Sequence, residues 1–139
     1  MADKGFRITV LTEEKAVIDD TVLSITAPGT EGYLGVLRNH APLVTGLQPG
    51  KLTIRKLNEQ EELYAVAGGF LEISRNTATV LADAIEALSE IDVSRAERAA
   101  ERARERLSQK DSGIDQVRAQ GALSRALNRI RLARVARMG

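Results

Sequence analysis

The segment EIDVSRAERA, residues 90–99, marks the point at which one kind of sequence gives way to another. Before it, apolar and polar residues alternate in short runs; after it, alanines, glutamates and arginines recur at helical spacing. Asp92 stands at this boundary with Arg95 three residues later, and aspartate is a favoured N-cap of a helix. We therefore predict a fold in two parts, residues 1–86 and residues 87–139.

The part before the boundary has the pattern of short β-strands. Its alternating runs are rich in β-branched residues and are separated by turn sequences such as PGTEG and QPG. These runs are FRITVLT, TVLSITA, KLTIRKL, ELYAVA, FLEIS and TATVLA. Because no helical pattern intervenes between them, the sequence predicts an antiparallel β-sandwich or barrel.

The part after the boundary has the pattern of two helices. Alanines recur at helical spacing from about residue 92, the segment SQKDSG interrupts them, and a second helix is predicted from about Asp115 to Arg137. A short linker between helices predicts an antiparallel hairpin, so the chain as a whole is predicted to be α+β. Alanine facing alanine buries little area, and we therefore expect the hairpin to be mobile.

Charge is distributed unevenly between the two parts. Residues 1–86 hold 8 Lys and Arg against 12 Asp and Glu, about −4, whereas residues 87–139 hold 12 against 7, about +5. The chain has no cysteine, which excludes disulfides and thiolate metal sites. No apolar run approaches the roughly 20 residues of a membrane-spanning helix. Any membrane association is therefore expected to come through a partner.

Motifs of an independent enzyme are missing from the sequence. The segment GLQPGK, residues 46–51, is one residue short of a phosphate-binding loop, and Leu52 stands where a hydroxyl residue is needed. His40 is the only histidine and has no recognisable nucleophile near it in sequence. We expect no catalytic residue and no metal site.

The second predicted helix carries a stripe of arginines. At 100° per residue, Arg118, Arg125 and Arg129 lie within about 20° of one direction, and Arg102 of the first helix could face the same groove. Such a stripe is often only a solvated face. This one lacks balancing glutamates, so it could also bind a nucleotide phosphate, a nucleic acid or an acidic protein surface. The residues alone leave these alternatives open, and capping alone is a sufficient role for Asp92.

Taken together, GYLGVLRNHAPLVTGL, AVAGGFLEI, TVLAD and ALNRIRLA closely resemble the epsilon subunits of F-type ATP synthases, in order and over essentially the whole chain. The resemblance implies a β-domain that docks on the gamma subunit and the ring of c subunits, with Arg38, Asn39 and His40 in the docking surface. It also implies a non-catalytic, peripheral subunit at the cytoplasmic face of the bacterial plasma membrane. The hairpin would inhibit ATP hydrolysis by reaching the alpha and beta subunits.

The segment IDVSRA also matches the I-D-x-x-R-A pattern of epsilon subunits that bind ATP. By this resemblance, the base and ribose pocket would be lined by Glu86, Ile91, Asp92 and Ala96. The phosphates would be met by Arg102, Arg118, Arg125 and Arg129, with Arg95 orienting Asp92. ATP would be a regulatory ligand that requires no metal, is not hydrolysed and stabilises the folded, non-inhibitory hairpin. The alternatives are a purely structural coupling hairpin and a nucleic-acid-binding helix; the resemblance implies no nucleic-acid partner.

Overall fold

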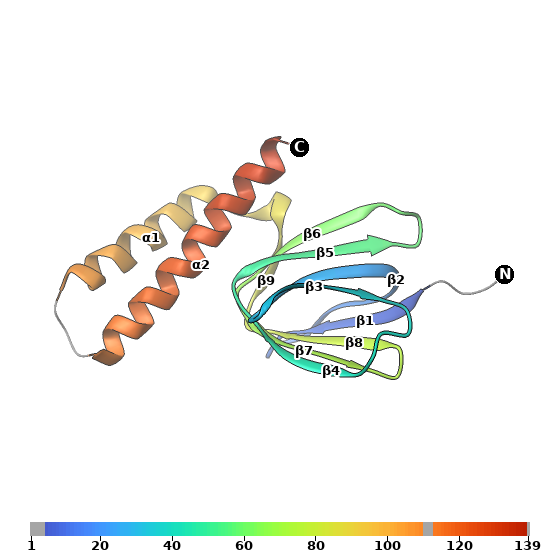
Figure 1. Cartoon of the computed structure of the whole chain (residues 1–139). Helices are drawn as coiled ribbons and strands as arrows, with labels where there is room; N and C mark the ends of the chain where they lie inside the picture. The colour runs from blue at the N-terminus through green and yellow to red at the C-terminus, as the bar shows by residue number, and fades with distance from the viewer. Residues whose placement is uncertain (1–4, 110–112, 139) are drawn as a thin grey trace. The chain divides into compact units, whose positions relative to one another are not determined.

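The computed structural model describes residues 5–109 and 113–138, and the chain divides into two compact units between Ala87 and Leu88 (Figure 1). Over the described residues, the strands of the first unit are β1 (Phe6–Leu11), β2 (Ala16–Gly29), β3 (Gly32–Leu37), β4 (Leu43–Leu47), β5 (Gly50–Lys56), β6 (Glu61–Val66), β7 (Gly69–Ser74), β8 (Thr77–Ala82) and β9 (Ile85–Ala87). The second unit contains the 3₁₀ turn η1 (Leu88–Glu90) and the helices α1 (Val93–Ser108) and α2 (Gly113–Met138).

The strands of the first unit form one sheet that closes on itself through β2. Their order is β1-β8-β7-β4-β2-β5-β6-β9, with β3 beside β2 and a further pairing of β1 with β2. At 14 residues, β2 is long enough to pair with β1 in its first half and with β3 and β5 in its second. A register shift between Val22 and Ser24 marks an irregularity of the kind that bends a strand. The predicted β-sandwich is confirmed.

One pairing departs from the antiparallel pattern that the sequence predicts. β1 runs parallel to β8, from Arg7 opposite Thr77 to Leu11 opposite Leu81. Most of the domain separates these strands in sequence, so no tight turn dictates their relative direction. Burial fixes their register instead, because Ile8 of β1 faces the core just as its partner Ala78 of β8 does.

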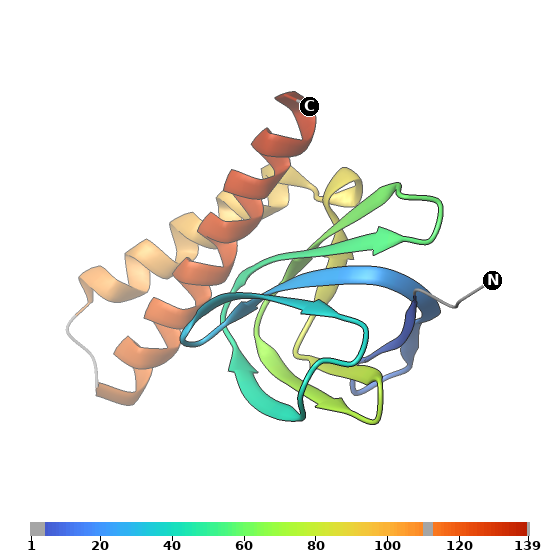
Figure 2. The ribbon, with the colours of Figure 1, turned by 45° about the vertical axis from the view of Figure 1, so that its right-hand side comes forward.

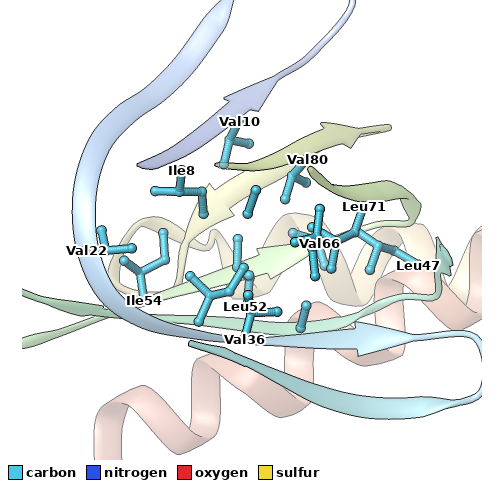
Figure 3. Close-up of a cluster of buried hydrophobic side chains, with 14 of the residues drawn as sticks. Ile8, Val10, Val22, Val36, Leu47, Leu52, Ile54, Val66, Leu71 and Val80 are labelled. Carbon is cyan, nitrogen blue, oxygen red and sulfur yellow. The ribbon is translucent and has the colours of Figure 1, made fainter. Parts of the chain in front are cut away.

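The core of the sandwich is built from alternate residues of the strands (Figure 3). Ile8, Val22, Leu52, Ile54 and Leu71 are at most 1% exposed. Aliphatic side chains fill the interior because aromatic residues make up only 3% of the chain. Full burial of one such side chain stabilises a fold by roughly 1.5–3 kcal/mol, so this layer holds the sandwich together.

In the second unit, α1 and α2 lie side by side and run in opposite directions (Figure 2). The predicted hairpin is thereby confirmed, and Asp92 is the N-cap of α1 as predicted. The predicted linker SQKDSG lies partly at residues 110–112, outside the described residues. Neither helix, over the residues described, combines the length and the hydropathy needed to cross a membrane.

Candidate functional site

The start of α1 is organised around the carboxylate of Asp92. Its Oδ1 accepts a hydrogen bond from the backbone N–H of Arg95 at 3.0 Å, and its carbonyl oxygen accepts one from the N–H of Ala96 at 3.0 Å. The link between Asp92 and Arg95 thus runs through the backbone amide of Arg95. A carboxylate at this position also interacts favourably with the positive end of the helix dipole. The cap therefore fixes where α1 begins, and Asp92 itself is exposed.

The seam between the two helices is made of small side chains. Ala96 and Ala100 of α1 form one buried cluster with Ala126 and Ile130 of α2. At the other end of the hairpin, Nε2 of Gln116 donates to the carbonyl oxygen of Gln109 at 2.7 Å. These contacts fix an antiparallel register in which residues 96–100 lie level with residues 126–130.

This register gathers arginines of both helices on one face of the hairpin. Angles around each helix axis are counted from the seam, at 100° per residue, against the direction of increasing residue number. In α1, Arg95, Arg102 and Arg106 lie about 80–120° from the seam. In α2, Arg118, Arg125 and Arg129 lie about 60–100° from the seam in the same sense. Both helices are right-handed and they run in opposite directions. A rotation from the seam against increasing residue number therefore leads to the same side of the hairpin in each helix. We call these six arginines the basic face.

The register also arranges the basic face into three cross-helix pairs, each roughly level along the hairpin. They are Arg95 with Arg129, Arg102 with Arg125, and Arg106 with Arg118. At a rise of 1.5 Å per residue, neighbouring pairs lie about 8 Å apart along the hairpin axis. Arg129 is half-buried and the other five are exposed.

Three arginines of the basic face stand outside the ion pairs formed by the described residues of the hairpin. Among the described residues, no ion pair engages the guanidinium of Arg102, Arg118 or Arg125. The ion pair within α1 joins Arg104 to Glu101 at 3.5 Å, on the other flank of that helix. The basic face therefore has the charge and the spacing to hold an extended polyanion.

The remaining predicted site residues lie in different surroundings. Ala96 is 0% exposed within the seam, and Ile91 is 7% exposed. Glu86 is half-buried in β9, opposite Ala65 of β6, and so belongs to the first unit. The prediction missed Arg106. The spacing of 3 and 4 residues along positions 92, 95, 99, 102 and 106 places Arg106 on the same side of α1 as Arg95 and Arg102. Which side of the hairpin this is becomes known only from the residues that form the seam.

A second predicted surface lies in the first unit, in the loop between β3 and β4. The N–H of His40 donates to the carbonyl oxygen of Leu37 at 3.1 Å, which closes a tight turn with Asn39 at φ 64°. The ring Nδ1 of His40 lies 2.7 Å from the carbonyl oxygen of Ala41. Arg38 and Asn39 are exposed and His40 is half-buried, so the turn presents polar groups on a fixed backbone.

The outer face of the sheet is unusually apolar at β4, the strand that follows this loop, and at β7 and β8, the next two strands in the sheet. Val44 of β4 is 70% exposed, and Phe70 of β7 and Leu81 of β8, which are direct cross-strand partners, are 59% and 51% exposed. Phe70 and Leu81 also line an open groove of about 480 Å³, together with Leu11 and the acidic residues Glu13 and Asp83. Large neighbouring apolar side chains on the surface of a domain favour a protein-protein contact.

Comparison with known proteins gives consistent matches over both units. The beta-sandwich domain of the ATP synthase delta/epsilon chain matches residues 5–88, and the long alpha-helix domain of that chain matches residues 89–134. The ATP synthase epsilon chain of Moorella thermoacetica is 45% identical over 129 residues, covering 93% of this chain and 96% of the relative. That of Natranaerobius thermophilus is 44% identical over 138 residues, covering 99% and 98%.

Two solved structures share the fold. A chain of the Euglena gracilis mitochondrial ATP synthase, in an assembly of OSCP, F1 and c-ring, has a TM-score of 0.79 at 24% identity and covers 92% of this chain and 81% of its own length. A chain of the Tetrahymena thermophila mitochondrial ATP synthase central stalk and c-ring has a TM-score of 0.64 at 19% identity and covers 94% of each chain. At these identities, the likeness concerns the fold alone.

Proposed function

The chain belongs to the family of ATP synthase delta/epsilon chains, and on that premise we propose that it is a non-catalytic subunit of the central stalk whose helical hairpin is controlled by ATP. With ATP bound, the hairpin stays folded. Without ATP it opens, reaches the alpha and beta subunits and inhibits ATP hydrolysis. The observation that carries this proposal is the basic face, six arginines in three cross-helix pairs.

The spacing of the basic face supports a nucleoside triphosphate as its ligand. Asp92 lies ten residues from Arg102, or about 15 Å along α1 at 1.5 Å per residue. A carboxylate at one end can accept hydrogen bonds from the amino group of a base, while guanidinium groups further along bind phosphate oxygens. In this arrangement Arg102 and Arg125 meet the outer phosphates, with Arg129 between them and the base. Arg118 adds positive potential beyond the phosphates.

The same geometry supports binding without hydrolysis. Phosphoryl transfer needs a positioned nucleophile and stabilisation of the transferring group in line with it. Asp92, the carboxylate that we assign to the adenine base of ATP, stands about 15 Å from the arginines that we assign to the outer phosphates. ATP is thus proposed as a regulatory ligand that the arginines bind directly, with no metal required.

The alanine seam supports a two-state hairpin. Ala96, Ala100 and Ala126 each place a single methyl group in the seam, and a buried carbon is worth only about 0.8 kcal/mol. A ligand that bridges α1 and α2 therefore makes a large relative contribution. At a ligand concentration of 100 times Kd, binding to the folded form alone stabilises it by about 2.7 kcal/mol.

Calorimetric titration of ATP into the full chain tests whether the basic face and Asp92 bind ATP. We expect Arg125→Ala and Asp92→Ala each to weaken binding by tenfold or more, since each removes a charged hydrogen-bonding group from the ligand. Arg98→Ala is the matched control, because it deletes an exposed arginine from the outer surface of α1. If Arg125→Ala and Asp92→Ala bind ATP as tightly as the parent does, the basic face is not the ATP site.

The sandwich is proposed to attach the subunit to the rotor. The apolar outer face formed by Val44, Phe70 and Leu81 supports docking on a protein partner, which we assign to the gamma subunit, and the loop at Arg38–His40 is assigned to the c-ring. These contacts would hold the subunit at the cytoplasmic face of the bacterial membrane through the complex. Phe70→Ser should reduce binding to the rotor in co-purification. Leu57→Ser is the control and should not reduce it, because Leu57, 52% exposed, lies in the β5–β6 turn.

The alternative is a hairpin that only couples the rotor to the catalytic head. It predicts that removal of residues 88–139 leaves ATP hydrolysis by the assembled enzyme unchanged. Our proposal predicts that the same truncation raises hydrolysis when ATP is scarce. A hydrolysis assay at low and high ATP concentration distinguishes the two.

A further inference from the structure

Two tight turns of the sandwich are joined by a side-chain hydrogen bond. The backbone N–H of Asn39, in the β3–β4 turn, donates to Oδ1 of Asn76, in the β7–β8 turn, at 2.7 Å. Asn39 and Asn76 both adopt left-handed backbone conformations, with φ 64° and 60°. The carbonyl oxygen of Asn76 also accepts from the N–H of Arg7 at 3.4 Å. One residue thus holds the β3–β4 turn and the start of β1 against the β7–β8 turn.

Asparagine is well suited to this position. The residue pair Arg75–Asn76, at φ 51° and 60°, forms a two-residue turn between paired Ser74 and Thr77, a geometry that favours asparagine or glycine. Glycine would keep the backbone but would have no oxygen for the N–H of Asn39. The side chain of Asn76 is therefore what orients the neighbouring turn.

The bond joins two turns that each carry an arginine. Arg38 precedes Asn39 and Arg75 precedes Asn76, so each stands one Cα–Cα step, about 3.8 Å, from a hydrogen-bonded residue. Both are exposed, and among the described residues no ion pair engages either guanidinium. Arg7 beside the same turn differs, since Asp19 binds it through two hydrogen bonds of 2.8 and 2.9 Å.

We propose that Arg75 is a further docking residue: Arg38 and Arg75 stand on the two turns that the Asn39–Asn76 bond joins, and together they bind a carboxylate on a polypeptide loop of the c-ring. Two guanidinium groups can together hold one carboxylate through charge-assisted hydrogen bonds. Leu37, 65% exposed, supplies apolar contact next to the pair. The surrounding domain is acidic in composition, about −4 over residues 1–86, so this positive spot selects the orientation of an acidic loop. The inference rests on the docking part of the proposed function.

The test measures binding of the full chain to the rotor assembly of gamma subunit and c-ring, purified without this chain. Arg75→Asn removes the charge and places a residue that suits the left-handed turn; Arg38→Gln removes the other charge. Each should weaken binding roughly three- to tenfold and flatten its salt dependence, and the double variant should lose less than the sum, because both arginines bind one carboxylate. Asn76→Gly should also weaken binding, because it removes the oxygen that holds the β3–β4 turn, while its melting temperature stays similar to that of the parent.

Arg55→Gln is the control, since exposed Arg55 already pairs with Glu59 at 3.8 Å. If the parent chain and this control bind the rotor but Arg75→Asn binds equally well with the same salt dependence, the proposal is wrong while rotor docking stands. If the parent chain itself does not bind the rotor, the docking part of the proposed function fails as well. A loss confined to Asn76→Gly would assign Asn76 a structural role only and would also overturn the proposal.

Discussion

Replacing Ala100 by leucine should separate the two helices while leaving Asp92 and every arginine of the basic face unchanged. Ala100 is 1% exposed and lies in the cluster formed with Ala96, Ala126 and Ile130. The seam has room for a methyl group there and not for an isobutyl group. Overpacking of a closed core costs about 1–3 kcal/mol, and 2 kcal/mol corresponds to a factor of roughly 30 in the equilibrium between folded and open hairpin.

That factor carries over to ATP binding if only the folded hairpin binds. The apparent Kd for ATP equals the intrinsic value divided by the folded fraction, so Ala100→Leu should raise it by up to roughly 30-fold. Ser94→Leu is the matched control, because Ser94 is exposed on the outer surface of α1 and the exchange is also neutral in charge. The assay is calorimetry with ATP, combined with helix content by circular dichroism in the presence and absence of nucleotide.

One result would refute the reasoning. If circular dichroism shows that Ala100→Leu lowers the folded fraction of the hairpin severalfold at the assay temperature, but the apparent Kd stays within twofold of the parent value, ATP does not require the packed seam. The basic face would then bind nucleotide one helix at a time, and ATP would have no means of favouring the folded state, because a ligand shifts an equilibrium only through differential affinity.

Three further changes test separate parts of the molecule. Asp92→Asn should keep the helix cap, because asparagine caps as well as aspartate. It should weaken ATP binding roughly tenfold, since an NH₂ group that cannot accept a hydrogen bond replaces the second carboxylate oxygen; calorimetry and circular dichroism separate the two effects. Arg106→Ala should weaken ATP binding by about fivefold, or about 1 kcal/mol, because it removes positive potential beyond the phosphates, whereas Arg104→Ala on the opposite flank should not. The hydrogen bonds from Arg7 lower the pKa of Asp19 below 3.8, so the parent should be more stable to urea than Asp19→Asn above about pH 3.8, and this difference should vanish as the pH falls through the lowered pKa.

Local features of the sequence predicted most of the elements, and contacts between distant residues account for what they missed. Alternation in the β-strands and the cap at Asp92 are local, and both are confirmed. The parallel pairing of β1 with β8 and the bond between Asn39 and Asn76 join segments far apart in the chain, and no local pattern specifies them. The same holds for Arg106, whose place on the basic face depends on which alanines of α1 meet α2.

Ionic strength should act in opposite directions on the free and the nucleotide-bound hairpin. Without ligand, three pairs of arginines about 8 Å apart repel one another, and this repulsion opposes folding of the hairpin. Raising the salt concentration from 0.1 to 1 M shortens the screening length from about 10 Å to about 3 Å, which should raise the melting temperature of the ligand-free hairpin. The same screening should weaken ATP binding, because that binding is largely electrostatic. A hairpin whose arginines were only a solvated face would still show the first trend, because the repulsion does not depend on a ligand, but it would not show the second. A salt-independent Kd for ATP would contradict the assignment of the basic face as the phosphate site.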